Sequence, residues 1–176
     1  MRQMKLRMIA CGVLGAMLLA APAVAEVTAK APDGIVIQVK AEVALDRDDA
    51  WARLLDIASW WNSSHTYSGD AGNMSIDAVA GGCWCELWSG GEVEHGRVVA
   101  VMPRDMIRFD APLGPLQEMG VGAALTFTLS NSASPSKTAI VVDFRVTGSS
   151  LSGLDKLASV VDGVITEQVT RYASAK

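Results

Sequence analysis

Histidine and cysteine, the residues that build most metal centres and disulfide frameworks, are scarce in this chain. It holds two histidines and three cysteines among 176 residues. The histidines, His65 and His95, lie far apart in the sequence and form no paired motif such as H-x-x-x-H, so no strong metal-binding pattern is present. A chain of this length buries a core without disulfide bonds. The composition therefore predicts a single domain that holds no cofactor.

Long apolar runs are also lacking, apart from one at the N-terminus. There, basic residues precede the apolar run Met8–Ala21, and an A-x-A sequence ends at Ala25. This order predicts a secretory signal peptide over residues 1–25, which places the mature protein outside the cell or in the periplasm. A membrane anchor is the alternative, but the run is shorter than the ~20 apolar residues that a span needs. Nothing later in the chain is apolar enough to cross a bilayer.

The predicted mature chain is short of positive charge. Cleavage after Ala25 leaves 12 basic residues against 19 acidic ones, a formal charge of −7. This excess of negative charge argues against a nucleic-acid partner.

Alternating apolar and polar residues predict that the mature chain is rich in β-strands. After a short leader over residues 26–34, Ile35, Ile37 and Val39 alternate with polar side chains, as in a half-buried strand. Glycine pairs, a Pro-Arg pair and a polar run separate most of six further predicted strands. These strands span residues 74–80, 83–88, 92–102, 105–111, 121–130 and 138–147.

Two helical regions complete the pattern. Asp46 is a predicted N-cap for a first helix that leads to Trp60 and Trp61. Ser152 is a predicted cap for a long C-terminal helix with an apolar stripe, and Gln168 falls within that stripe. An antiparallel sheet with one apolar face needs a cover, and this helix is the only element long enough to supply it.

Several short motifs accompany this order of elements. They are Trp60-Trp61, the run His65-Thr66-Tyr67-Ser68-Gly69, Gly81-Gly82, and His95-Gly96-Arg97-Val98 before Pro103. With the closing helix, they resemble the SRPBCC or START-like superfamily over residues 35–172. Within it the chain looks most like the branch of chaperone-ATPase activators that is often grouped with polyketide cyclases.

The resemblance implies an α+β helix-grip fold for residues 35–176: a bent antiparallel sheet of about seven strands wrapped around the C-terminal helix. It also implies a cavity between sheet and helix for a hydrophobic or amphipathic molecule. It does not imply a reaction, because one fold supports many functions. Under the resemblance His65 and Tyr67 lie near the cavity entrance. They bind a ligand there or tie down their own Ser/Gly-rich loop.

The turn after Trp88 decides which side chains meet across the next hairpin. A Gly90-Gly91 loop, or a four-residue loop, places Glu86 opposite His95 and Trp84 opposite Arg97, whereas a three-residue Ser89-Gly90-Gly91 loop places Cys85 opposite His95. We favour the first register, because the second sets Glu86 against Glu94. The favoured register makes Glu86 and His95 a proton-transfer or ligand-orienting pair, with Arg97 available for an anionic head group. The alternative is an ion pair on the outer face.

Cys83 and Cys85 lie two residues apart in a predicted strand. A regular strand holds such side chains roughly 6.6 Å apart, too far for a disulfide, although export favours pairing and a distorted strand would permit it. Buried thiols, a disulfide, and a zinc or copper site completed by His65 or His95 therefore remain as alternatives.

Three functions are compatible with these residues. The first is an exported protein that binds a small hydrophobic or amphipathic ligand, with Trp60, Trp61, Trp84 and Gln168 completing the candidate site. The second is a cyclase- or hydrolase-type enzyme that uses Glu86 and His95, or a Cys/His metal site. The third is an envelope interaction module. Residues 111–119 form an apolar, proline-containing segment that is either a lid or a packed connection.

Overall fold

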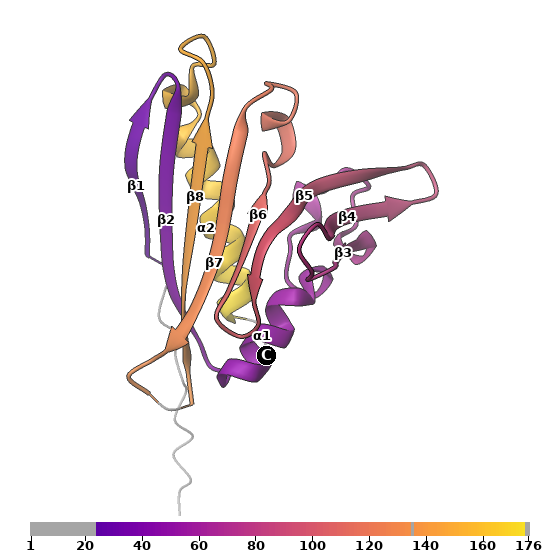
Figure 1. The fold of residues 1–176 in the computed structure, drawn as a ribbon, viewed down its shortest axis with the longest axis vertical. Helices are drawn as coiled ribbons and strands as arrows, with labels where there is room; N and C mark the ends of the chain where they lie inside the picture. Colours follow the sequence, from indigo (N-terminus) through magenta and orange to yellow (C-terminus); the bar gives the residue numbers. More distant parts are fainter. Residues whose placement is uncertain (1–23, 135, 175–176) are drawn as a thin grey trace, which may run out of the picture.

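The computed structural model describes residues 24–134 and 136–174. Within these ranges, eight antiparallel strands form one curved sheet in the order β1-β2-β8-β7-β6-β5-β4-β3 (Figure 1). The bounds are β1 Val24–Ala31, β2 Gly34–Val43, β3 Met74–Ile76, β4 Cys83–Trp88, β5 Gly91–Met102, β6 Met106–Asp110, β7 Gly122–Asn131 and β8 Thr138–Thr147. The arrangement is α+β and helix-grip-like, with eight strands where about seven were expected.

The additional strand, β1, lies in the segment that the sequence marked only as a leader. It pairs with β2 from Val24↔Lys40 to Ala31↔Gly34 and forms one edge of the sheet. Most of its described side chains are exposed, and only Val27 packs against the core. Backbone hydrogen bonds to β2 therefore hold this strand in place. Such bonds do not require apolar side chains, so β1 lacks the alternating apolar pattern that identifies a strand in the sequence. Residues 1–23, which carry most of the predicted signal peptide, lie outside the described part of the chain.

Helix α1, Arg47–Leu55, begins as predicted. The side chain of Asp46 accepts hydrogen bonds from the backbone N–H groups of Asp48 and Asp49, both at 3.0 Å. Since a carboxylate at this position satisfies donors that have no partner within the helix, Asp46 sets the start of α1. Short 3₁₀ turns at Ile57–Ser59, Ser63–His65 and Ala71–Asn73 carry the chain from α1 to β3.

The C-terminal helix α2 spans Ala158–Ser174 and starts later than predicted. A 3₁₀ turn at Leu154–Lys156 precedes it, and the Ser152 hydroxyl accepts from the backbone N–H of Ser149 instead of capping the helix. The apolar stripe is confirmed: Leu154, Ile165, Val169 and Tyr172 are all buried. The helix lies behind the strands in Figure 1, where it covers the inner face of the sheet.

Edge-to-face aromatic contacts join the elements around α2. The Trp60 ring lies 5.5 Å from Tyr172 in α2 and 6.5 Å from Phe127 in β7, and the Trp61 ring lies 4.9 Å from Trp84 in β4. The Tyr172 hydroxyl also donates to the backbone carbonyl of Ala50, at 2.8 Å. Because such rings bury large areas at defined angles, this cluster fixes α2 against the sheet.

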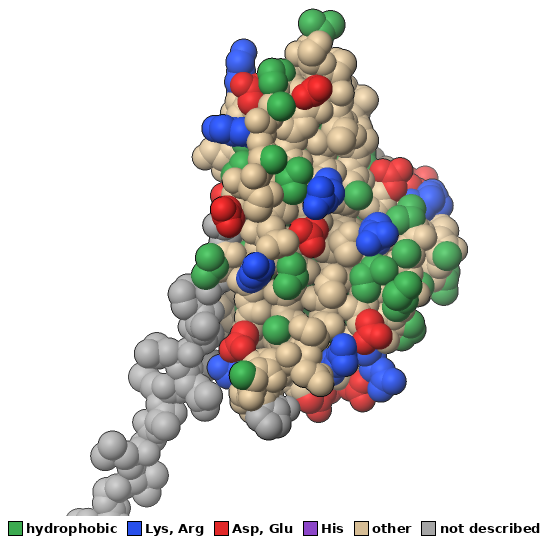
Figure 2. Space-filling view, turned by 60° about the vertical axis from the view of Figure 1, so that its left-hand side comes forward, with side chains coloured by type: hydrophobic (Ala, Val, Ile, Leu, Met, Phe, Trp, Pro, Cys, Tyr) green, Lys and Arg blue, Asp and Glu red, His purple; other side chains and the backbone are tan. Residues whose placement is uncertain are grey.

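The opposite face of the sheet is polar, and side chains pair there between neighbouring strands. Gln38 in β2 donates to Asp143 in β8 at 2.9 Å, and Arg108 in β6 donates to Thr126 in β7 at 3.0 Å. The space-filling view shows basic and acidic side chains interspersed, with small apolar groups between them (Figure 2). Among the described helices, none has the length and hydropathy that a bilayer crossing requires.

Candidate functional site

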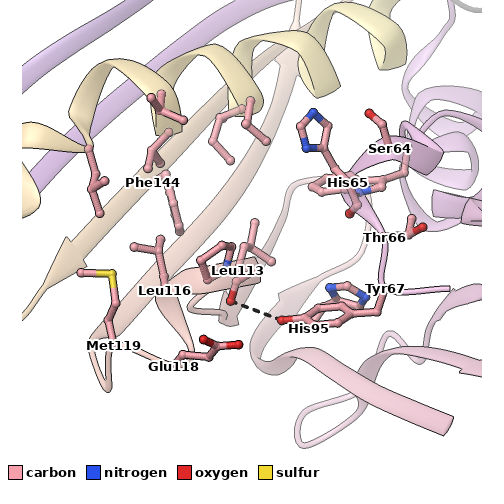
Figure 3. A pocket seen from close by; sticks show the side chains of 18 residues that line it. Ser64, His65, Thr66, Tyr67, His95, Leu113, Leu116, Glu118, Met119 and Phe144 are labelled. Carbon is pink, nitrogen blue, oxygen red and sulfur yellow. Dashed lines mark hydrogen bonds between the residues drawn. The ribbon is translucent and has the colours of Figure 1, made fainter. Parts of the chain in front are cut away.

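A cavity of about 470 Å³ opens between α2 and the inner face of the sheet (Figure 3). Its apolar wall comes from α2, from Phe144 in β8 and from the loop between β6 and β7. Polar side chains from the segment after α1, together with His95 of β5, line the remaining wall. The lining residues are Trp61, Ser64, His65, Thr66, Tyr67, His95, Leu113, Gly114, Pro115, Leu116, Glu118, Met119, Phe144, Leu157, Val160, Val161, Val164 and Ile165.

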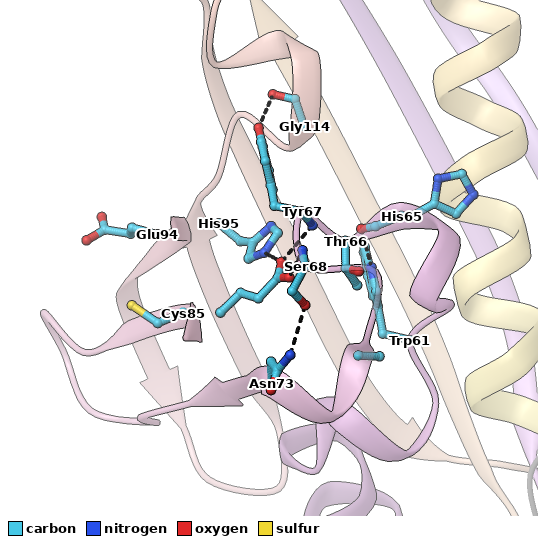
Figure 4. A network of polar contacts seen from close by, with 12 residues as sticks. Trp61, His65, Thr66, Tyr67, Ser68, Asn73, Cys85, Glu94, His95 and Gly114 are labelled. Atoms are coloured by element: carbon cyan, nitrogen blue, oxygen red, sulfur yellow. Dashed lines mark hydrogen bonds and ion pairs between the residues drawn. The ribbon is translucent and has the colours of Figure 1, made fainter. Parts of the chain in front are cut away.

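A buried carboxylate, that of Glu86, lies behind this polar wall. One oxygen, Oε2, accepts from the Tyr67 backbone N–H at 3.0 Å and lies 2.8 Å from Nε2 of His95. The other, Oε1, accepts from the backbone N–H of Ser68. Glu86 is fully buried and His95 is 2% exposed. The predicted contact between Glu86 and His95 is therefore confirmed, and both residues are buried on the inner face. Figure 4 shows His95 beside Tyr67 and Ser68.

The predicted register that led to this contact is wrong. The turn contains Ser89 and Gly90, so Trp88 pairs with Gly91 and Glu86 pairs with Val93. None of the proposed loops occurs. Glycine fits at position 90 because the Trp88 indole lies against the turn, where a Cβ on Gly90 would come 2.7 Å from its Nε1.

A β-bulge then brings His95 to Glu86. Cys85 pairs with Glu94 and Trp84 pairs with Gly96, which leaves His95 as the extra residue of β5. Gly96 fits here because its Cα faces Ala111, and a Cβ on Gly96 would come 2.6 Å from the Cβ of Ala111.

The same bulge removes Arg97 from the candidate site. Arg97 pairs with Cys83 on the outer face, where its guanidinium binds the Glu94 carboxylate and the Gly81 carbonyl. In Figure 4, Glu94 and Cys85 point away from His95. The expectation that Arg97 shares a face with Trp84, Glu86 and His95 is therefore contradicted, because one extra residue reverses the alternation along β5.

Burial and hydrogen bonding set the ionisation of the buried pair. Burial works to raise the pKa of Glu86, but hydrogen bonds from Ser68, Tyr67 and His95 outweigh it and lower the pKa below 4.5. Burial lowers the pKa of His95 below 6.5, against the opposing pull of Glu86. At neutral pH the pair is thus a carboxylate and a neutral imidazole. Because a carboxylate only accepts, Nε2 of His95 carries the proton and Nδ1 carries a lone pair.

The second histidine, His65, is held by α2. Its Nε2 lies 3.2 Å from Oε2 of Glu167, and the Asn62 side chain donates to the other oxygen of the same carboxylate. The Asn62 side chain, followed by His65, lowers the pKa of Glu167, although burial opposes them. The backbone N–H of Asn62 also donates to Oε1 of Gln168 at 2.8 Å. His65 therefore fixes its loop to α2, which is the structural role considered for it, and it also lines the cavity.

The segment between β6 and β7 covers the cavity and is held at two points. The Tyr67 hydroxyl donates to the Gly114 carbonyl at 3.4 Å (Figures 3 and 4). Nε2 of Gln117 donates to the Glu94 carbonyl at 2.7 Å. The first bond is long, so it adds little. In this segment Leu113–Leu116 and Met119 line the cavity, and Ala111 and Leu116 are buried, so the segment is a packed cover over the site.

Four of the nine candidate ligand-binding residues line the cavity: Trp61, His65, Tyr67 and His95. Glu86 lies behind His95, and Arg97 lies outside. The other three are packed in the core and do not reach the cavity: Trp60, Trp84 and Gln168.

Cys83 and Cys85 form a disulfide, one of the three states left open by the sequence. Their Cα atoms lie 5.4 Å apart, which is within the range of disulfides. Both sulfur atoms are engaged and lie on the outer face, so they do not meet either histidine. Across the described residues, no three His, Cys, Asp or Glu side chains converge on a point where a metal ion would fit.

Sequence reasoning missed Glu167 and the cavity-lining residues Ser64, Thr66 and Val164. Glu167 lies next to Gln168 at the border of the apolar stripe, and this position could have identified it as a candidate site residue. Ser64 and Thr66 flank His65 in a loop whose path depends on Glu86, a contact that no local pattern reports.

Comparison with known proteins supports the fold. No protein-family model and no curated protein sequence matches the chain. Among solved structures, a Thermobifida fusca protein has a TM-score of 0.56 at 14% identity, covering 78% of this chain and 90% of its own. DynU16, from the dynemicin biosynthetic locus, has a TM-score of 0.54 at 19% identity, covering 78% of this chain. The di-domain ARO/CYC StfQ, from the steffimycin biosynthetic pathway, has a TM-score of 0.53 at 12% identity, covering 81%.

This chain matches 45% of DynU16 and 50% of StfQ, about half of each. At these identities the likeness concerns the fold, an antiparallel sheet packed on a C-terminal helix.

The Glu86 network predicts a stability that depends on pH. A carboxyl whose pKa is lowered by folding stabilises the fold fully above the unfolded value of 4.5, and this stabilisation is lost as pH falls through the folded value. We expect Glu86→Gln to destabilise the protein by about 1–3 kcal/mol at pH 7, since an amide donor faces other donors there. The variant should also lose part of the wild-type decline in stability below pH 4.5.

Urea unfolding followed by circular dichroism between pH 3 and 8 measures both effects. Glu94→Gln is the matched control, because it makes the same exchange at a half-exposed ion pair and should change stability little. If both substitutions changed the free energy of unfolding equally, the buried hydrogen bonds of Glu86 would stabilise the fold no more than the exposed ion pair of Glu94.

Proposed function

We propose that this protein binds a small hydrophobic or amphipathic molecule in the cavity between the sheet and α2. The observation that carries the proposal is an apolar cavity of about 470 Å³ in which a few polar groups converge at one end. This size lies within the range of roughly 300–1,000 Å³ typical of small-molecule sites. Two proteins of the same fold belong to biosynthetic systems, those of dynemicin and steffimycin, which agrees with a small-molecule ligand.

Burial of apolar surface supplies most of the binding energy in this proposal. A ligand that buries ~300 Å² of apolar area gains roughly 7 kcal/mol before the costs of association, which remove much of it. Contacts to the polar end, where His95 and Tyr67 lie, therefore have to contribute for the complex to be tight.

Filling the cavity tests the proposal. The neutral fluorophore N-phenyl-1-naphthylamine should bind the wild-type protein with enhanced fluorescence. Val164→Trp places a large side chain inside the cavity and should weaken binding at least tenfold, by roughly 1.4 kcal/mol. Val99→Trp adds the same ring to the outer face of β5, where Val99 is 54% exposed, and should leave binding unchanged. Equal binding by both variants and the wild type would contradict a site in this cavity.

Acid–base catalysis in the same cavity is the second candidate function. The observation that favours it is a buried neutral imidazole, that of His95, oriented by the ionised Glu86 and lining an apolar space. This is the arrangement of a general base held by a carboxylate. Ligand orientation and proton transfer would use the same two side chains, Glu86 and His95. A measurement of turnover separates the two roles.

An apolar ester, 4-nitrophenyl hexanoate, serves as the test substrate for this second candidate. If His95 acts as a general base, His95→Ala should slow hydrolysis by about 10²–10⁴-fold, while N-phenyl-1-naphthylamine still binds. Hydrolysis by this pair is excluded if the rate of ester hydrolysis is no higher than in buffer alone. It is also excluded if the rate is the same in His95→Ala as in the wild type.

We also propose that the protein is exported and acts outside the cytoplasm. The N-terminal sequence supports export, and the Cys83–Cys85 disulfide agrees with an oxidising compartment. Cleavage after Ala25 would remove only the first two paired residues of β1 and leave the pairing from Glu26 to Ala31 in place.

N-terminal sequencing of the protein recovered from the periplasm of a producing bacterium tests this prediction. We expect the mature chain to begin at Glu26. An uncleaved chain confined to the cytoplasmic fraction would contradict export.

A further inference from the structure

The cavity has two chemically different ends, and the difference restricts the ligand. Figure 3 shows Phe144, Leu116 and Met119 toward one end and His65, Thr66, Tyr67 and His95 toward the other. A bound amphiphile would therefore place its tail along α2 and its head group beside the two histidines.

The polar end has no positive side chain. Among the described residues that line the cavity there is no lysine or arginine, and the one carboxylate in the lining is that of Glu118, which is exposed. Arg53 and Arg171, near the base of α2, donate through Nε to the carbonyls of Tyr172 and Trp60 and do not line the cavity. Arg97 is on the outer face of the sheet.

The negative charges around the polar end are already matched by donors. The Glu86 carboxylate accepts from two backbone N–H groups and from His95, and the Glu167 carboxylate accepts from Asn62 and contacts His65. These carboxylates disfavour a second anion nearby. Each of their oxygens already has a hydrogen-bond partner, which weakens their attraction for an ammonium group.

His95 supplies a hydrogen-bond acceptor at this end. Its Nε2 is committed to Glu86, and within the described part of the chain its Nδ1 has no hydrogen-bond partner. The residue is 2% exposed and lines the cavity, so a bound molecule would replace water as the partner of Nδ1. A ligand that donates a hydrogen bond satisfies Nδ1, whereas a carboxylate sets a lone pair against a lone pair.

We propose that the cavity selects amphiphiles whose head group is an uncharged hydroxyl, with the O–H donating to Nδ1 of His95, over carboxylates of the same skeleton. This inference rests on the proposed binding function and deepens it by naming the class of ligand. It reverses the expectation from the sequence, in which Arg97 was available for an anionic head group.

Four ligands with one skeleton test the selection at pH 8, where the carboxylic acid is ionised and the phenol is not. They are 4-hexylphenol, its methyl ether 4-hexylanisole, 4-hexylbenzoate and 4-hexylbenzylammonium, each measured by displacement of N-phenyl-1-naphthylamine. We expect the phenol to bind about tenfold more tightly than the ether, the value of one hydrogen bond, and the benzoate to bind most weakly.

Two variants locate the effect. His95→Phe removes the acceptor but keeps a ring, so the phenol and the ether should bind it equally well. Arg97→Gln should leave all four affinities unchanged, because Arg97 lies on the outer face. The comparison of ligands on the wild-type protein decides the matter even if His95→Phe does not fold.

Each outcome bears on a different proposal. If the probe does not bind the wild-type protein, the proposed binding function and this inference fail together. If the probe binds and the benzoate or the ammonium displaces it as well as the phenol does, or if the phenol and the ether are equal, this inference alone is overturned. A loss of benzoate binding in Arg97→Gln would likewise overturn it, because the head group would then reach the outer face.

Discussion

The burial of one ionised carboxylate, that of Glu86, organises the wall of the cavity. A carboxylate removed from water costs several kcal/mol unless donors surround it. Here the donors come from two separate places: the backbone at Tyr67 and Ser68, and the imidazole of His95. Neither the loop after α1 nor the β4–β5 hairpin satisfies Glu86 alone. The charge therefore couples the two segments, and it orients the ring that faces the cavity.

The sequence predicted the strands whose two faces differ most, and it predicted the contact in the core of the site. Alternation located β2, β7 and β8, and the spacing of apolar residues located α2. It failed where backbone pairing dominates, as in β1, and where one inserted residue changes the register. His95 met Glu86 although the predicted pairing was wrong, because the turn lies one residue earlier than predicted and the bulge at His95 partly offsets that shift. Arg97, two residues later, was consequently assigned to the wrong face.

The cavity is bounded by three elements that are held in different ways. The α2 wall is fixed by the buried aromatic contacts of Trp60 and Tyr172, and the polar end is fixed by Glu86. The segment between β6 and β7 buries Ala111 and Leu116 in the core, and two side-chain hydrogen bonds join it to its surroundings. The cavity is therefore enclosed by packed parts of the fold on each of these sides.

The disulfide on the outer face marks the place where the β4–β5 ladder is irregular. In a regular strand the Cα atoms of residues two apart lie roughly 6.6 Å from each other, whereas those of Cys83 and Cys85 lie 5.4 Å apart. The register of the ladder shifts between Trp84 and Cys85, within the segment that the disulfide closes. Reduction would therefore remove a covalent restraint from one face of this wall, while the hydrogen bonds of Glu86 lie on the other face.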